Sequence, residues 1–140
     1  MANKYFSLCF ILSAYILSLG NSCFIHKYRN FEVHIINRLP RNNSTPLLVH
    51  CASKDDDLGN HTLTLNQYFN FQFCDNPFAT MFFCHLWWGN KDKAFEVINA
   101  ELRKRLKTGN RQLAWIAKGD GIYVSNSFPP ADPLEKMYDW

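Results

Sequence analysis

The chain lacks the features that mark nucleic-acid-binding and membrane-spanning proteins. Its 140 residues include 15 Lys and Arg against 12 Asp and Glu, a formal net charge of only +3. So small a surplus does not indicate nucleic-acid binding. No apolar run reaches the roughly 20 residues that a membrane-spanning helix needs, and the sequence has neither internal repeats nor a compositionally biased linker. We therefore expect one small domain with no nucleic-acid partner and no stable membrane insertion.

The N-terminal segment has the pattern of a secretory signal peptide. Lys4 supplies a small positive charge, and the residues of 8–19 are almost all apolar. Gly20 and Ser22 are small residues that permit cleavage after them. We predict a signal peptide over 1–22 and a secreted, extracellular domain over 23–140. An uncleaved signal anchor is the alternative.

Cysteines and glycosylation sequons fit this extracellular interpretation. Four cysteines remain after cleavage, namely Cys23, Cys51, Cys74 and Cys84, and they allow three disulfide pairings. Three N-glycosylation sequons begin at Asn42, Asn43 and Asn60. The first two sequons overlap, so we expect only one of those two asparagines to carry sugar.

Alternating and β-branched runs predict short strands at 31–37, 47–51, 61–65, 68–74 and 80–88, followed by a hairpin over 113–124. The segment 93–107 is ambiguous, and we expect a short strand and then an irregular or helical excursion. The tail 127–140 contains three prolines and is expected to leave the sheet as an extended or mobile segment. About seven to eight short strands with frequent turns predict an all-β fold, an antiparallel β-sandwich.

The most distinctive stretch is the acidic loop between the second and third predicted strands. Asp55, Asp56 and Asp57 can each bond to nearby backbone, and Gly59 can adopt a positive φ. Three adjacent carboxylates need water, so we expect the turn to project outward. A calcium site is the functional alternative, but the loop lacks the alternating ligands and distal glutamate of an EF-hand. We favour a solvated turn.

Histidines and cysteines raise the question of catalysis or metal binding. Secreted ribonucleases pair two histidines, and the candidates here are His34, His50, His61 and His85. Each of them fits an ordinary strand position, and nothing in the sequence places two imidazoles in one cleft. Zinc binding by the His50–Cys51 and Cys84–His85 pairs is rejected because adjacent strand residues face opposite sides of a sheet. No cysteine lies in a nucleophile signature, so we expect no enzyme, cofactor or metal site.

Two further clusters have a structural and a functional interpretation. One of Trp87 and Trp88 must face inward, so a sugar-stacking platform of both is disfavoured. The one basic run contains Arg103, Lys104, Arg105 and Lys107. It could contact an acidic receptor or an anionic membrane, but a solvated helical face is the simpler interpretation.

Several blocks together are recognisable: VHIIN, LLVHCASKDDDLGNHTL, FNFQF, MFFCHLWW, AFEV and AWIAKGDGIY. In this order and spacing, over about 33–123, the chain resembles the plant self-incompatibility protein family, the S-protein homologues. HC-x-SKDDDLG and W-x-x-x-x-DGIY are specific only in combination. The resemblance implies a small secreted β-sandwich, and the type members of the family are pistil ligands recognised by pollen in self-rejection.

The cysteines depart from the family pattern. Cys51 and Cys84 match family positions, whereas Cys23 and Cys74 look like additions. Members usually carry a further pair shortly before the tryptophan that corresponds to Trp115, and this chain has none there. A tight turn after Cys74 would leave it about 16 Å from Cys84, too far to bond. Our hypothesis is a Cys51–Cys84 disulfide.

The resemblance implies a secreted ligand for cell–cell recognition or signalling, of the type used in self-incompatibility. We expect a monomer that contacts an unknown cell-surface receptor or other extracellular protein. Loops on a rigid scaffold often carry recognition, and the candidates are 38–45, 52–60 and 89–93. The alternatives are a secreted cationic defence protein acting on membranes and a ribonuclease-like hydrolase.

Overall fold

The computed structural model describes residues 29–42, 44–75, 81–106 and 111–140. The predicted signal peptide, Cys23 and Asn43 lie outside these ranges. Within the described residues, no helix is both long and apolar enough to cross a membrane.

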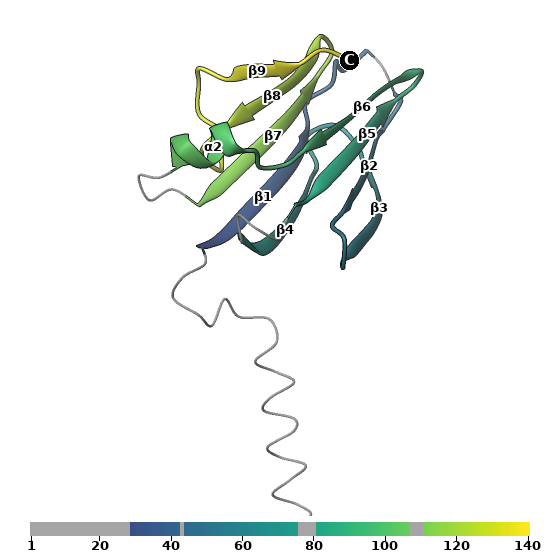
Figure 1. Ribbon diagram of the computed structural model, residues 1–140. Helices are drawn as coiled ribbons and strands as arrows, with labels where there is room; N and C mark the ends of the chain where they lie inside the picture. The colour runs from purple at the N-terminus through teal and green to yellow at the C-terminus, as the bar shows by residue number, and fades with distance from the viewer. Residues whose placement is uncertain (1–28, 43, 76–80, 107–110) are drawn as a thin grey trace, which may run out of the picture.

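Strands dominate the described part of the chain. They are β1 (Arg29–Asn37), β2 (Leu47–Ala52), β3 (Asp57–Leu63), β4 (Tyr68–Asp75), β5 (Phe83–Trp88), β6 (Lys91–Glu96), β7 (Gln112–Lys118), β8 (Gly121–Ser125) and β9 (Glu135–Tyr138), with one short helix, α2 (Ala100–Arg105). One sheet has the order β4-β1-β7-β8-β9 and the other β3-β2-β5-β6. The two sheets form a sandwich (Figure 1). The prediction of an all-β sandwich is confirmed.

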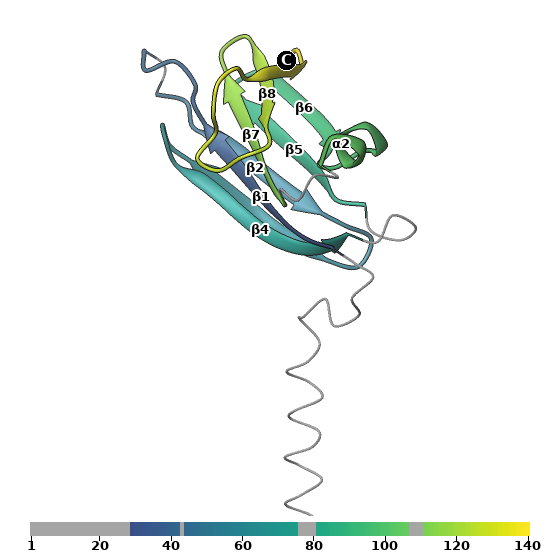
Figure 2. The same ribbon diagram turned by 90° about the vertical axis from the view of Figure 1, so that its left-hand side faces the viewer.

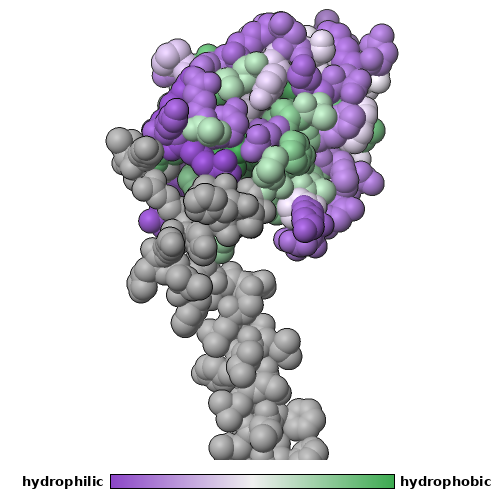
Figure 3. All heavy atoms as spheres, viewed as in Figure 1, coloured by the Kyte–Doolittle hydropathy of each residue, from purple (hydrophilic) through white to green (hydrophobic). Residues whose placement is uncertain are grey.

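The core lies between the sheets because each strand alternates inward and outward side chains. Phe31, Val33 and Ile35 of β1 are buried together with Leu47 and Val49 of β2 in one large cluster. Figure 3 shows that some apolar residues also lie at the surface, surrounded by hydrophilic residues. The alternation in the sequence of β1 therefore matches the burial of Phe31, Val33 and Ile35.

One strand pair is parallel, whereas we expected antiparallel pairing throughout. β1 pairs with β7 in parallel, with Val33 opposite Leu113, and the other pairings in the described part are antiparallel. β4 and β5 lie in different sheets, so the strands of Cys74 and Cys84 do not form the hairpin that a tight turn after Cys74 would give. The chain therefore passes from one sheet to the other between β4 and β5, and local residue patterns do not encode such crossings.

The tail after β8 covers the outer face of the five-stranded sheet and then joins that sheet. Phe128 and Leu134 pack against Ile36 and Ile116 on this face, and the connection to β9 lies across it (Figure 2). Beyond the three prolines, β9 pairs with β8 at the edge. The prediction that 127–140 leaves the sheet is wrong, because the prolines lie in the connection and a strand follows them.

The ambiguous segment forms β6 and then α2, so the expected strand and helical excursion are confirmed. The Asn99 side chain caps α2 by accepting a hydrogen bond from the Leu102 N–H, 2.9 Å away, and Leu102 itself is buried. Arg105 forms ion pairs with Glu101 and Glu135, so the helix is fastened to β9. These contacts agree with a structural role for the basic run.

His34 of β1 is buried beneath the tail. Its ring stacks on Phe128 with 3.7 Å between ring centroids and contacts Tyr68 edge-on. Neither ring nitrogen has a hydrogen-bond partner, although Nε2 lies 3.4 Å from a Glu32 carboxylate oxygen. Burial lowers the pKa of His34, and the nearby Glu32 charge opposes this only in part.

We expect the free energy of unfolding to decrease as the pH falls below about 6.5, the value for an unperturbed histidine. Below this pH the unfolded chain binds a proton at His34 more readily than the folded protein does, because burial disfavours the charged ring. Acid therefore favours unfolding. Urea midpoints at pH 7.5 and 5.5 measure this effect, and His34→Phe should show a smaller decrease than the wild type. An identical decrease in both proteins would contradict the prediction.

Candidate functional site

The three candidate contact loops lie at two opposite ends of the sandwich. β2 starts beside the 38–46 connection, and Leu48 near its start lies opposite Trp87 near the end of β5. The turn at Gly89 is therefore at the same end as 38–46, and the acidic loop that follows β2 is at the other end (Figure 1). Two of the three loops are brought together, and the third is separate.

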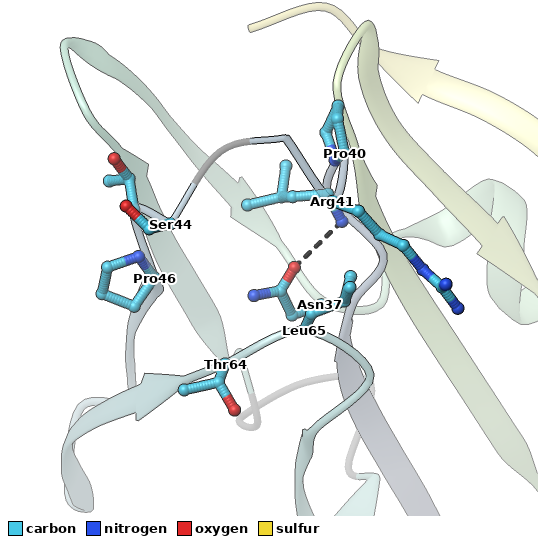
Figure 4. Close-up of a pocket in the computed structure, with 9 residues that line it drawn as sticks. Asn37, Pro40, Arg41, Ser44, Pro46, Thr64 and Leu65 are labelled. Carbon is cyan, nitrogen blue, oxygen red and sulfur yellow. Dashed lines mark hydrogen bonds between the residues drawn. The ribbon is translucent and has the colours of Figure 1, made fainter.

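A pocket of about 260 Å³ opens at the first end. The 38–46 connection forms most of its wall, and Thr64 and Leu65, which follow β3, complete it (Figure 4). Arg41 and Ser44 are exposed beside it. On the other side of the connection, a Cβ at Gly119 would lie 2.9 Å from Cγ of Pro40. The connection is thus held closely against the β7–β8 turn.

Asn37 fixes the shape of this pocket. Its buried side-chain oxygen accepts a hydrogen bond from the Leu39 N–H at 2.9 Å (Figure 4), and its amide nitrogen donates to the Leu63 carbonyl at 2.8 Å. Its backbone also bonds to Gln67 and Asn66. The end of β1 is therefore tied to the turn after β3. Asn37 is not among the site residues predicted from the sequence, although a polar side chain at the inward position after Phe31, Val33 and Ile35 was a usable signal.

Replacing Asn37 by alanine should lower the free energy of unfolding by about 2–3 kcal/mol, because buried Leu39 and Leu63 backbone groups would lose their partners. Urea unfolding of unglycosylated protein measures this loss. Asn42→Ala, at an exposed position in the same connection, is the matched control and should change stability by less than about 0.5 kcal/mol. Equal losses in the two variants would show that Asn37 does not anchor the connection.

The acidic loop at the other end is a solvated turn, as predicted. Asp55, Asp56 and Asp57 are exposed, and Gly59 has φ +76°. Ser53 shapes the turn, since its hydroxyl accepts from the Asp56 N–H at 3.0 Å. β3 begins at Asp57, earlier than the predicted strand, after an irregularity in its pairing with β2.

Asp57 is the one residue of this acidic trio that reaches across to a histidine. Its carboxylate accepts hydrogen bonds from the Gly59 N–H at 2.9 Å and from His50 Nε2 at 2.8 Å. The Gly59 bond, followed by the His50 bond, lowers the pKa of Asp57.

His50 and His85 lie opposite each other on neighbouring strands, facing outward, while Cys51 and Cys84 beside them face inward. The expectation that adjacent residues point to opposite sides is confirmed. Strand register nevertheless pairs these two imidazoles, which the local sequence did not indicate. His85 Nε2 bonds to Asp92 at 2.7 Å, as His50 does to Asp57. The pair lies on an open sheet face, and no cluster of three or more metal-binding side chains occurs in the described ranges.

The Cys51–Cys84 disulfide is present, with Cα atoms 4.1 Å apart, so the pairing hypothesis is confirmed. Cys74 is also disulfide-bonded, and its partner lies outside the described residues. Asn42 and Asn60 are exposed, as glycosylation at these positions would require, and Asn43 lies outside the described residues.

The remaining aromatic candidates have separate positions. Trp87 lies on the outer face and stacks on His85, with ring centroids 3.8 Å apart. Trp88 packs against the main core, so the expected division between a surface and a core tryptophan is confirmed. His61 stacks on Phe69 at 3.7 Å, as an ordinary strand residue.

Known proteins resemble this chain over most of its length. Residues 32–140 match the family model described as plant self-incompatibility protein S1. S-protein homolog 24 of Arabidopsis thaliana is 32% identical over 144 residues, covering 99% of this chain and 93% of the relative. S-protein homolog 8 of the same plant is 34% identical over 121 residues, covering 86% and 89%.

Self-incompatibility protein S1 of Papaver rhoeas is 36% identical over 109 residues, covering 73% of this chain and 76% of the relative. No solved structure matches the chain. The resemblance seen in the sequence blocks is confirmed by these matches. The chain belongs to the plant self-incompatibility protein S1 family.

Proposed function

We propose that the protein is a secreted ligand that acts by direct contact in recognition between cells, and not as an enzyme. The match of residues 32–140 to the family model carries this proposal, together with the similarity to a relative named self-incompatibility protein S1. The Cys51–Cys84 disulfide supports it, because such bonds persist in oxidising extracellular compartments. The same proposal includes a signal peptide over 1–22 and an N-glycan on Asn42 or Asn43. The protein acts as a monomer on a cell-surface receptor or other extracellular protein.

The contact surface of this ligand is the end that carries the 38–46 connection and its pocket. Buried Asn37 fixes the start of the connection at Leu39 and ties it to Leu63, and Pro40 and Pro46 limit backbone freedom at their own positions. A surface that is already ordered loses little conformational entropy on binding. Exposed Arg41 gives it a charge that an acidic partner would recognise.

Neither alternative function gains an observation in its favour. His50 and His85 lie on an open face rather than in a cleft, and each is already bonded to a carboxylate. Arg105 of the basic run is paired with two glutamates, which weakens its attraction to an anionic membrane.

Proximity labelling with the secreted full chain, fused to a peroxidase, tests the proposal. Pollen and vegetative cell surfaces are labelled in parallel, with reduced and unfolded protein as the control. We expect one or a few surface proteins to be labelled by the folded protein alone. Equal labelling by the folded and unfolded proteins on every surface would contradict a contact ligand.

Charge reversal at the two ends locates the contact. Arg41→Glu should weaken binding to the labelled cells at least about tenfold, because it places like charges against an acidic partner. Lys54→Glu in the exposed acidic loop is the matched control and should leave binding within about twofold. Titration of intact cells with fluorescently labelled protein measures the binding of both variants. The reverse pattern would move the contact to the acidic end.

A further inference from the structure

An apolar hollow lies beside a glycosylation sequon on the outer face of the four-stranded sheet. Leu48, which is 45% exposed, lies between Thr62 of β3 and Trp87 of β5 in the strand register. The hollow has a volume of about 400 Å³, and Leu48, Asn60, Thr62 and Trp87 are among the residues that line it. Its floor is apolar, and the sequon Asn60-His61-Thr62 forms its wall.

The tryptophan in this hollow is held in a fixed position. Trp87 stacks on the His85 ring at 3.8 Å with 22° between the ring planes. His85 is fixed in turn by its 2.7 Å hydrogen bond to Asp92. A ligand that packs on Trp87 therefore meets an ordered ring and loses little of its binding free energy to ordering the site.

We propose that the first N-acetylglucosamine of an N-glycan on Asn60 packs over Leu48 and Trp87 and shields this hollow. Asn60 is exposed on the same face, diagonal to Leu48 across the β2–β3 pairing, at the roughly 7–8 Å typical of diagonal neighbours. The sugar has an apolar C–H face and an acetyl methyl group, which are driven onto apolar side chains by the hydrophobic effect. Its other, hydroxyl-bearing side stays in water.

The covalent step needs a polyprenyl-pyrophosphate-linked oligosaccharide as co-reactant. A bond forms between Asn60 Nδ2 and C1 of the sugar, and the bond from C1 to the pyrophosphate oxygen breaks. The lipid pyrophosphate leaves with the bonding electrons, and the amide proton is released. The hollow is then covered by the protein's own glycan, so a protein partner contacts another surface, such as the 38–46 connection.

The test uses full chain secreted by cells that make only high-mannose glycans, trimmed by endoglycosidase H to a single N-acetylglucosamine. Thr62→Ala removes the sequon, and Thr62→Ser, which keeps it, is the matched control. The ¹H–¹⁵N indole signal of Trp87 is identified by its loss in Trp87→Phe. Asn60→Gln, which removes the acceptor asparagine and keeps an uncharged amide, gives a second sugar-free sample.

We expect mass spectrometry to find one sugar on Asn60 of the trimmed protein. The Trp87 signal should show a nuclear Overhauser effect to the acetyl methyl group, and it should shift in both sugar-free samples but not in Thr62→Ser. An unmodified Asn60, or the same Trp87 signal with and without sugar, would overturn the proposal. So would a dimer of the glycosylated protein that buries Trp87, since a second copy would then occupy the hollow.

Discussion

Replacing Trp115 by alanine is expected to lower the free energy of unfolding by about 4–5 kcal/mol. Trp115 is fully buried at the centre of the core and packs on Phe95, with ring centroids 4.5 Å apart, and on Tyr138 at 6.0 Å. Its indole nitrogen donates a hydrogen bond to the Val97 carbonyl at 3.2 Å. The substitution leaves a large cavity and an unpaired buried carbonyl. Urea unfolding followed by circular dichroism measures the loss.

Trp87→Ala is the matched control, because it removes the same side chain from the outer face of a strand. It should cost about 1 kcal/mol in unglycosylated protein. Equal losses for the two tryptophans would mean that the sandwich does not depend on the contact between β6, β7 and β9 that Trp115 provides.

Removing the Cys51–Cys84 disulfide is expected to lower the free energy of unfolding by about 4 kcal/mol. The two cysteines are 33 residues apart in sequence. A cross-link over a loop of this length lowers the conformational entropy of the unfolded chain, which raises the free energy of unfolding by about 4 kcal/mol. The Cys51→Ala/Cys84→Ala variant leaves no unpaired thiol at this site. Its urea midpoint, compared with that of the oxidised wild type, measures the effect.

Peptide mapping without reduction is the control for this variant. It should find Cys51 joined to Cys84 in the wild type and the bond of Cys74 retained in the double variant. An unchanged urea midpoint, or either cysteine found with another partner, would contradict the assignment.

Local residue patterns predict what is local in this fold. The alternation in β1 and β4 predicts both the strands and their buried faces, and Gly119, Asp120 and Gly121 mark the turn between β7 and β8. The acidic loop is predicted as a solvated turn for the same reason, since adjacent carboxylates and a glycine specify it without help from distant residues.

Features that depend on distant residues escape such patterns. The parallel pairing of β1 with β7 and the meeting of His50 with His85 arise from strand order and register, which the local sequence does not contain. β9 was missed because the prolines before it dominate the local signal, whereas its pairing with β8 decides the outcome. Which of the candidate loops share one end of the sandwich also follows only from the topology.

The candidate site was accordingly predicted in part. The loop 38–45 is a candidate because loops on a rigid scaffold often carry recognition, and the structure adds a pocket beside it. Asn37, whose side chain holds Leu39 of the connection, ends the predicted strand 31–37, and no role was predicted for it there. Its inward position in the alternating pattern was the better guide.

Hydrogen–deuterium exchange of the full chain, alone and bound to the surface protein found by proximity labelling, tests the proposed contact most directly. Exchange should slow on binding in residues 38–46, and it should be unchanged in the acidic loop 53–56. Slower exchange confined to the acidic loop, or to the outer face of the four-stranded sheet, would contradict the account.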